Sequence, residues 1–180
     1  DDAAPVGICG SGLVDLVAVL LDAGVIDATG RLRNDVAGPL AARVTERDDR
    51  RVFEVDAEAG IVLTQADVRE TQLAVAAVRA GIELLIAEAG GVEPVEVVVA
   101  GGFGRHLRAD ALARLGVIPS AWAGRVSFVG NAALAGARML LAGPVAQEGA
   151  RAVASASETL DLASHPAFQE RFIAGLTFPG

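Results

Sequence analysis

The chain has 180 residues, of which 52% are hydrophobic, and a formal net charge of -8. This charge argues against a nucleic-acid partner, because phosphates demand a basic face, and against docking on an anionic membrane surface. The 15 lysine-plus-arginine positions are all arginine, which excludes a P-loop lysine and a Schiff-base lysine. The single cysteine excludes an internal disulfide and a thiolate-rich metal site, and it favours a reducing, cytoplasmic setting.

The chain opens with "DDAAPV" and no initiator methionine, so we expect a piece of a longer protein. No signal peptide is visible. The longest apolar runs are interrupted by Asp15, Asp22 and Arg138. These runs are therefore too short and too polar to span a bilayer.

The first third of the chain predicts one helix followed by a small irregular unit. The periodicity of Leu13 to Ala23 indicates a helix, and Gly24 is a natural C-terminal stop. Residues 28–60 are charged and turn-rich, with "RVFEV" and "GIVL" flanking an "AEAG" turn that predicts a hairpin. We expect 28–60 to be a small inserted subdomain, and 1–27 with 61–180 to form the core lobe.

A long helix is predicted to begin after Thr64, which is a good N-cap. Asp67 stands where a capping box requires an acidic side chain, and Gly90-Gly91 ends the helix. Arg79 lies in this helix among alanines, so it is either buried with a partner or directed at a ligand.

The next segment has the order expected of a parallel α/β unit. The run from Val95 to Ala100 is apolar and β-branched, which is typical of a strand buried on both faces. A helix over Leu107 to Leu115 and a second strand, "RVSFV", follow, so we expect the two strands to be parallel neighbours. The segment "GNAALAGARMLLAG" (130–143) predicts a second helix that starts at a glycine. The tail predicts further helices over 145–155 and 166–174, with a short "ETLDLA" strand between them.

Three turns share one design, in which an apolar entry leads through glycines into a helix. They are "VGICGSGLVD", "VVVAGGFGRHL" and "SFVGNAALAGA". Glycine lets a backbone approach a ligand closely, and the free N–H groups of a helix start favour an anion. The alternative is that each glycine only permits close packing of strand and helix. Three such turns favour nucleotide binding at the carboxyl ends of the strands.

Established motifs do not fit these turns. "GICGSG" has the wrong order for the dinucleotide fingerprint, and a nucleophile elbow would need a glycine where Ser11 stands. A catalytic Cys9 would need a histidine base, but His106 and His165 have no motif context. We interpret Cys9 as a small buried hydrophobic residue, His106 as a helix-surface residue, and His165 as a residue of an N-cap region. Trp122 and Phe103 are expected in the core or in a cleft wall, although Phe103 follows the glycine pair closely enough to border an adenine pocket.

The order of five sequence blocks resembles the C-terminal region of the reductive activators of corrinoid proteins. The blocks are "GICGSGLVDLVAVLLDAGVID", "LTQADVRETQLAVAAVRAGIELL", "VVVAGGFGRHL", "VGNAALAGA" and "AFQERFIAGLTFP". They cover nearly the whole chain and are weakest across 28–60. Such proteins belong to the superfamily of actin, sugar kinases and heat-shock chaperone ATPases. The resemblance implies an incomplete α/β lobe with the ribonuclease-H-like fold of an actin-like ATPase domain.

The resemblance also assigns site residues. "AGGFG" matches the adenosine motif, which gives Gly101, Gly102, Phe103 and Gly104 nucleotide-binding roles, with Phe103 bordering the adenine pocket. Gly10, Ser11 and Gly12 resemble the turn beside the ribose and phosphates in the chaperone ATPases. The helix over 64–79 matches one that flanks the adenine, so Arg69, Gln72 and Arg79 are further candidates.

Family members resembling this chain use ATP to return an inactive cob(II)amide to cob(I)amide, with an electron from an N-terminal [2Fe–2S] domain. The chain lacks the aspartate-glycine motifs that hold metal and phosphate, and it lacks a four-cysteine cluster site. ATP, Mg²⁺ and the [2Fe–2S] cluster are therefore expected only in a longer parent protein. We expect no catalytic residue, no metal site and no activity in this piece alone.

The expected partner is a corrinoid protein, with a homodimer left open. Two alternatives remain. In the first, the chain is a non-catalytic docking or dimerisation lobe with the same fold. In the second, it is part of an ATP-dependent activator of another metalloenzyme, because a fold does not fix the electron acceptor.

Overall fold

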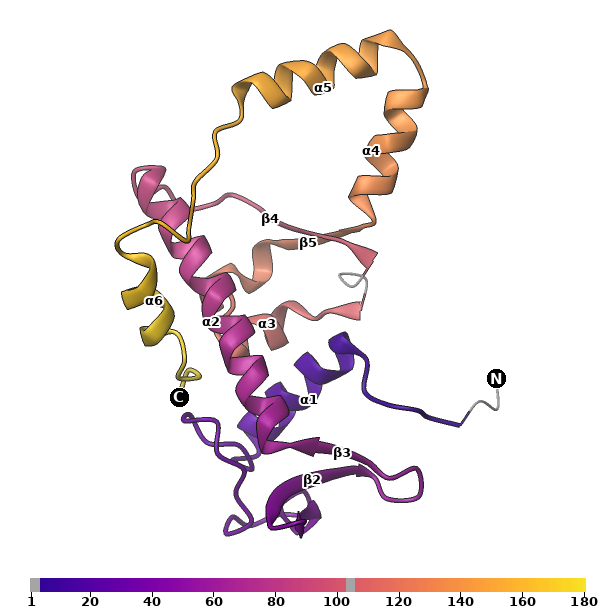
Figure 1. Cartoon of the computed structure of the whole chain (residues 1–180), viewed down its shortest axis with the longest axis vertical. Coiled ribbons are helices and arrows are strands. Elements are labelled where there is room, and N and C mark those ends of the chain that lie inside the picture. Colours follow the sequence, from indigo (N-terminus) through magenta and orange to yellow (C-terminus); the bar gives the residue numbers. More distant parts are fainter. Residues whose placement is uncertain (1–3, 103–105) are drawn as a thin grey trace.

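Helix α2 (Gln65–Glu88) runs through the middle of the molecule, and the computed structural model describes residues 4–102 and 106–180 around it (Figure 1). The predicted capping box is confirmed. The Asp67 backbone N–H donates to Thr64 Oγ1 at 3.1 Å, and the Thr64 backbone N–H donates to Asp67 Oδ2 at 2.8 Å. After Glu88 the chain leaves the helix through Gly90 and Gly91, which have φ values of 79° and 77°. These left-handed conformations favour glycine and stop the helix.

The segment before α2 contains one helix and a three-stranded antiparallel sheet. Helix α1 (Gly10–Asp22) starts three residues earlier than predicted and ends before Gly24, whose φ is 67°. The predicted hairpin is confirmed as β2 (Arg50–Asp56) and β3 (Ile61–Thr64). A further strand, β1 (Val44–Arg47), pairs with β2 after the short helix η1 (Ala41–Arg43). Sequence analysis did not predict β1.

The predicted parallel unit is also confirmed. Strands β4 (Val97–Ala100) and β5 (Val126–Gly130) pair in parallel, with Val97 opposite Val126. They are connected through α3 (Ala109–Leu115) and the 3-10 helix η3 (Ser120–Arg125). Helix α3 starts two residues later than predicted.

Two predictions about strands are wrong. The strand after α2 is not buried on both faces, because burial alternates along β4 and Val98 is 54% exposed. Only one face of this two-stranded sheet is covered within the described chain. The segment 158–163 is not a strand. Asp161 instead closes a turn by accepting from the Ala163 N–H and from the Ser164 hydroxyl, and Leu162 packs beside Gly81.

The three tail helices are present with slightly different limits. They are α4 (Ala132–Leu141), α5 (Pro144–Ala156) and α6 (Phe168–Ala174). Helices α4 and α5 form an arch that stands away from the rest of the molecule (Figure 1). No residue of α4 or α5 is buried, and all of both helices lies within the described part. None of the helices in the described ranges combines the length and apolar character that crossing a bilayer would require.

Two clusters form the core. The larger one joins α1, the small sheet and the first half of α2 through residues such as Leu20, Phe53 and Val68. The smaller one contains Leu112, Ile118 and Trp122, against which the remaining face of β4 packs.

The side chain of Gln72 links three distant parts of the chain. Gln72 is 1% exposed, and its Nε2 donates to the carbonyl of Thr29 at 3.1 Å and to that of Leu176 at 2.7 Å. Its Oε1 accepts from Arg69 at 3.2 Å. Gly30 lies directly against this amide, and a Cβ atom at Gly30 would overlap it. This buried polar group is therefore satisfied only while the turn at Gly30 keeps its glycine.

Replacing Gly30 by alanine should destabilise the chain more than the same change at Gly60. Both glycines have positive φ, 83° and 69°, but a Cβ at Gly60 meets nothing within 4 Å. Backbone strain alone should cost about 1 kcal/mol at Gly60. Displacing the Gln72 amide should raise the cost at Gly30 to about 3 kcal/mol. Urea unfolding of both variants measures the difference, and equal losses would contradict the role given to Gln72.

Candidate nucleotide site

The three glycine turns lie on the same side of the molecule. The start of α1 and the carboxyl ends of β4 and β5 all point to the right in Figure 1. The last two turns are joined directly, because the Gly101 N–H donates to the Gly130 carbonyl at 2.6 Å. The third begins α4, where Asn131 caps the helix by accepting from the Leu134 N–H at 3.0 Å. We call this side of the molecule the glycine edge.

The α1 end of the glycine edge is built by Cys9, Gly10, Ser11 and Gly12. Cys9 is the N-cap, and its Sγ accepts from the Gly12 N–H at 3.4 Å. Ser11 is buried, with its Oγ 3.4 Å from the same sulfur. The first turn carries no acidic side chain, so its N–H groups and the helix dipole remain favourable to an anion.

The β4 end of the glycine edge is open. Gly101 has a φ of 114°, which favours glycine, and a Cβ built there meets nothing within 4 Å. A Cβ at Gly102 also meets nothing within that distance, and Gly102 has no positive φ. Packing within the described chain therefore gives no reason for glycine at 102. Phe103 and Gly104, the other two residues predicted for this turn, lie outside the described residues.

Arg79 is not brought to the glycine edge. Its Nε donates to Glu83 Oε1 at 2.8 Å, one turn further along α2, and its side chain is 36% exposed. It lines a cavity whose lining includes none of the glycines predicted for the nucleotide. Arg69 and Gln72, the other candidates on this helix, bond to each other. The structure therefore separates these three residues from the glycine turns.

The prediction that Cys9 is buried is wrong, since its side chain is exposed at the start of α1. The hydrogen bonds from Ser11 and from the Gly12 N–H lower the pKa of the Cys9 thiol below its ordinary value. His165 lies where predicted, before α6, and its Nδ1 accepts from the Ala167 N–H at 3.2 Å. His106 is exposed, but it precedes α3 instead of lying on that helix.

Asp15 is a polar residue that the sequence analysis did not single out for the site. It lies in α1, one turn after Gly12, and its Oδ1 is buried without a hydrogen-bond partner in the described chain. Asp15 borders a cavity of about 270 Å³ between α1 and α3, together with Arg108 and Arg114. In the sequence, the acidic residue within the apolar run "GLVDLV" was the signal that could have identified Asp15 as a candidate. A buried unsatisfied carboxylate oxygen needs a donor, which a ligand or another part of a longer protein could supply.

Acidic and cysteine side chains do not gather around the glycine edge. Among residues 4–102 and 106–180, no group of three or more histidine, cysteine, aspartate or glutamate side chains could hold a metal ion. The backbone at Gly101 and Gly102 is open, and the described residues offer no cluster of oxygen ligands for Mg²⁺.

The chain is an α/β domain of the actin-like ATPase type. The family model described as the C-terminal domain of RACo, the ASKHA domain, matches residues 1–180, and the chain belongs to this family. A solved structure titled reductive activator for corrinoid, iron-sulfur protein superposes with a TM-score of 0.85 at 34% identity, over 97% of this chain and 29% of that one. The resemblance and the fold class predicted from the sequence are confirmed.

Two curated relatives agree with this assignment. The corrinoid activation enzyme RamQ of Eubacterium limosum is 32% identical over 188 residues, which cover 97% of this chain and 32% of that protein. The Co(II) methylated amine-specific corrinoid protein reductase of Methanosarcina barkeri is 31% identical over 140 residues, covering 76% of this chain and 22% of that protein. The chain thus spans about a third of the length of these relatives, or less.

The lowered pKa of Cys9 predicts a reactive thiol that depends on Ser11. The rate of alkylation by iodoacetamide, followed against pH, should have its midpoint below that of an ordinary cysteine, because the thiolate is the reacting form. Ser11→Ala should move the midpoint upward. Labelling is unambiguous because the chain has one cysteine.

Ser127→Ala is the matched control, since the Ser127 hydroxyl donates to Glu96, the residue before β4, and is not a partner of Cys9. It should leave the profile unchanged. Identical midpoints for wild type and Ser11→Ala would refute the stated cause of the shift.

Proposed function

We propose that this chain is the nucleotide-facing lobe of an ATP-dependent reductive activator of a corrinoid protein. The names of the two curated relatives and of the solved structure support the corrinoid part of this proposal. The glycine edge supports the nucleotide part. The open backbone at Gly101 and Gly102 is the observation that carries the proposal most directly.

In this proposal the adenosine lies against Gly101 and Gly102, next to Phe103 and Gly104. Gly10, Ser11 and Gly12 lie beside the ribose and phosphates, where the start of α1 favours negative charge. The Mg²⁺ ion and the groups that act on the phosphates come from other parts of a longer protein. This chain contributes binding and orientation, and none of its residues is assigned a catalytic role.

The electron would come from a [2Fe–2S] domain outside this chain, because a single cysteine cannot hold such a cluster. The recipient would be the Co(II) corrinoid of a partner protein, in the cytoplasm. A homodimer is compatible with this arrangement.

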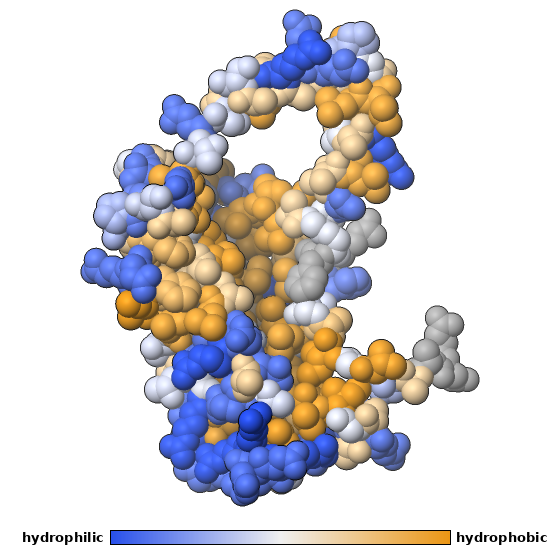
Figure 2. All heavy atoms as spheres, viewed as in Figure 1, coloured by the Kyte–Doolittle hydropathy of each residue, from blue (hydrophilic) through white to orange (hydrophobic). Residues whose placement is uncertain are grey.

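The exposed apolar surface supports the idea that the lobe is incomplete by itself. Val98 and Phe128 are 54% and 37% exposed on the two strands of the parallel sheet, and Leu141 on α4 is 87% exposed. Figure 2 shows hydrophobic side chains along α4 and in the hollow beneath the arch. In a longer protein we expect further structure to cover these surfaces.

The same surfaces favour a second candidate function, a docking or dimerisation lobe that keeps the fold without using nucleotide. An activator of a different metalloenzyme would keep the nucleotide site and change the partner. Nucleotide binding by the full-length protein separates the docking lobe from the proposal. Reduction of a corrinoid protein separates the activator of a different metalloenzyme from it.

The 180-residue chain alone should bind ATP weakly, with a dissociation constant in the millimolar range, because only the adenosine wall is present. Isothermal titration calorimetry with and without Mg²⁺ measures this. Tight, Mg²⁺-dependent binding, or steady ATP hydrolysis by the chain alone, would overturn the division of roles.

In the full-length parent, Gly102→Ala should weaken ATP binding by about tenfold or more while leaving the nucleotide-free thermal midpoint nearly unchanged. The new methyl group lies within 4 Å of no described atom, and the backbone at Gly102 has no positive φ. The substitution should therefore lower the affinity for ATP and not the stability of the fold. Gly149→Ala, in the exposed helix α5, is the control and should leave ATP affinity unchanged. A Gly102→Ala protein that binds ATP normally would require the nucleotide assignment to be withdrawn.

A further inference from the structure

A cavity of about 570 Å³ lies away from the glycine edge, between α2, the α3–η3 segment and α6. Its size falls in the range of sites for small organic molecules. The glycines of the nucleotide turns do not line it, and its floor comes from the second half of α2 and the turn that follows α3. This cavity is therefore a separate feature from the proposed nucleotide site.

The walls of the cavity are mainly apolar. Ile82 and Ile86 line it from α2, and Val117, Ile118 and Trp122 line it from the opposite side. Trp122 is 6% exposed, and its indole N–H already donates to Glu93 at 3.2 Å. The ring therefore offers the cavity an apolar surface and no spare donor.

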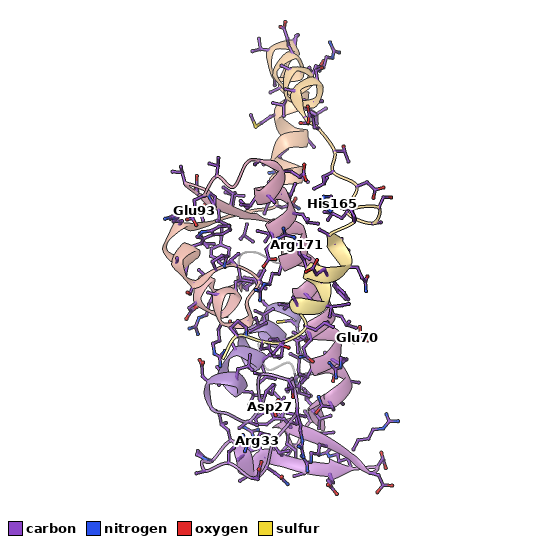
Figure 3. All side chains as sticks on the ribbon, turned by 90° about the vertical axis from the view of Figure 1, so that its left-hand side faces the viewer. Asp27, Arg33, Glu70, Glu93, His165 and Arg171 are labelled. Atoms are coloured by element: carbon purple, nitrogen blue, oxygen red, sulfur yellow. The ribbon has the colours of Figure 1, made fainter. Side chains whose placement is uncertain are left out.

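The charged side chains that line the cavity form one cluster. Glu83 Oε1 accepts from Arg79 at 2.8 Å. Arg171 lies on α6 (Figure 3), and its guanidinium group is 3.5 Å from Glu83 Oε2. Two guanidinium groups thus share one carboxylate, which leaves a net charge of one positive unit. Arg171 and Glu83 are each 36% exposed, so a ligand entering from solvent can reach them.

From this arrangement we infer that the cavity binds a small organic anion with one carboxylate on an apolar body. The apolar walls take up the body, and the guanidinium groups hold the carboxylate with charge-assisted hydrogen bonds. A neutral molecule of the same shape leaves the excess positive charge uncompensated, and a cation is repelled by it. The charge cluster therefore sets specificity, and the walls supply most of the affinity.

The chain carries its own reporter, because Trp122 is its one tryptophan. Tryptophan fluorescence should change saturably on titration with octanoate. Octanol should bind at least about threefold more weakly, and octylammonium more weakly still, since the charge cluster is partly exposed and its effect is moderate. Equal affinity for the three ligands, or no saturable signal with octanoate, would overturn the inference.

Variants of the charge cluster should act in opposite directions. Arg171→Gln should weaken octanoate binding by about threefold to fivefold and leave octanol unaffected. Glu83→Gln should tighten octanoate binding, because both guanidinium groups become available. Arg138→Gln, at an exposed site on α4, is the matched control and should change neither affinity.

A third variant locates the ligand. Ala113 lines the cavity from α3, and Ala113→Phe should fill part of it and lower octanoate affinity by about tenfold or more. Far-ultraviolet circular dichroism verifies that each variant is folded. Unchanged octanoate affinity in folded Ala113→Phe, or in both charge variants, would show that octanoate binds elsewhere.

Discussion

The buried amide of Gln72 is the contact on which the arrangement of this chain depends. It holds two carbonyls that lie 43 and 104 residues away in sequence, those of Thr29 and Leu176. Gln65, two turns earlier on α2, repeats the pattern by donating to the Gly30 carbonyl and accepting from the Leu32 N–H. Because an unpaired buried amide or carbonyl is costly, these bonds fix the loop after α1 and the C-terminal segment on the same helix.

That fixed frame explains how the glycine edge is positioned. Helix α1 packs beside α3, and the Arg114 side chain joins them by donating to Asp22 at 2.5 Å and to the Pro179 carbonyl at 2.6 Å. The bond between Arg114 and Asp22 therefore holds the end of α1 against the end of α3. The bond between Gly101 and Gly130 then aligns the other two turns. The backbone beside this bond is open, because a Cβ built at Gly101 or Gly102 meets nothing within 4 Å.

Local signals in the sequence predict most helices and strands of the chain. The features that the sequence did not predict depend on tertiary contacts. The cap of Thr64, the glycine stops and the order of strand, helix and strand depend on neighbours within a few residues. The exposure of Cys9 and Val98 depends on which other parts of the protein pack against them, and a local sequence pattern does not predict such packing. The sequence did not decide whether Arg79 is paired with another residue or directed at a ligand. In the structure it pairs with Glu83, at the helical spacing of four residues. The strand β1 was missed because "VTER" is short and polar, so its pairing with β2 comes from tertiary context.

The glycine edge and the uncovered apolar surface of α4 meet at the start of that helix. Helix α4 starts directly after its N-cap Asn131, on the glycine edge, yet its apolar residues Leu134, Met139 and Leu141 are 47%, 64% and 87% exposed. A helix held at one end by a cap, with no buried side chain, has little packing energy to fix its direction. Covering that face would supply the missing packing and would also order the turn beside the proposed adenosine position. Nucleotide affinity and the completion of the lobe should therefore be linked, since any partner that orders the turn removes part of the entropy cost of binding.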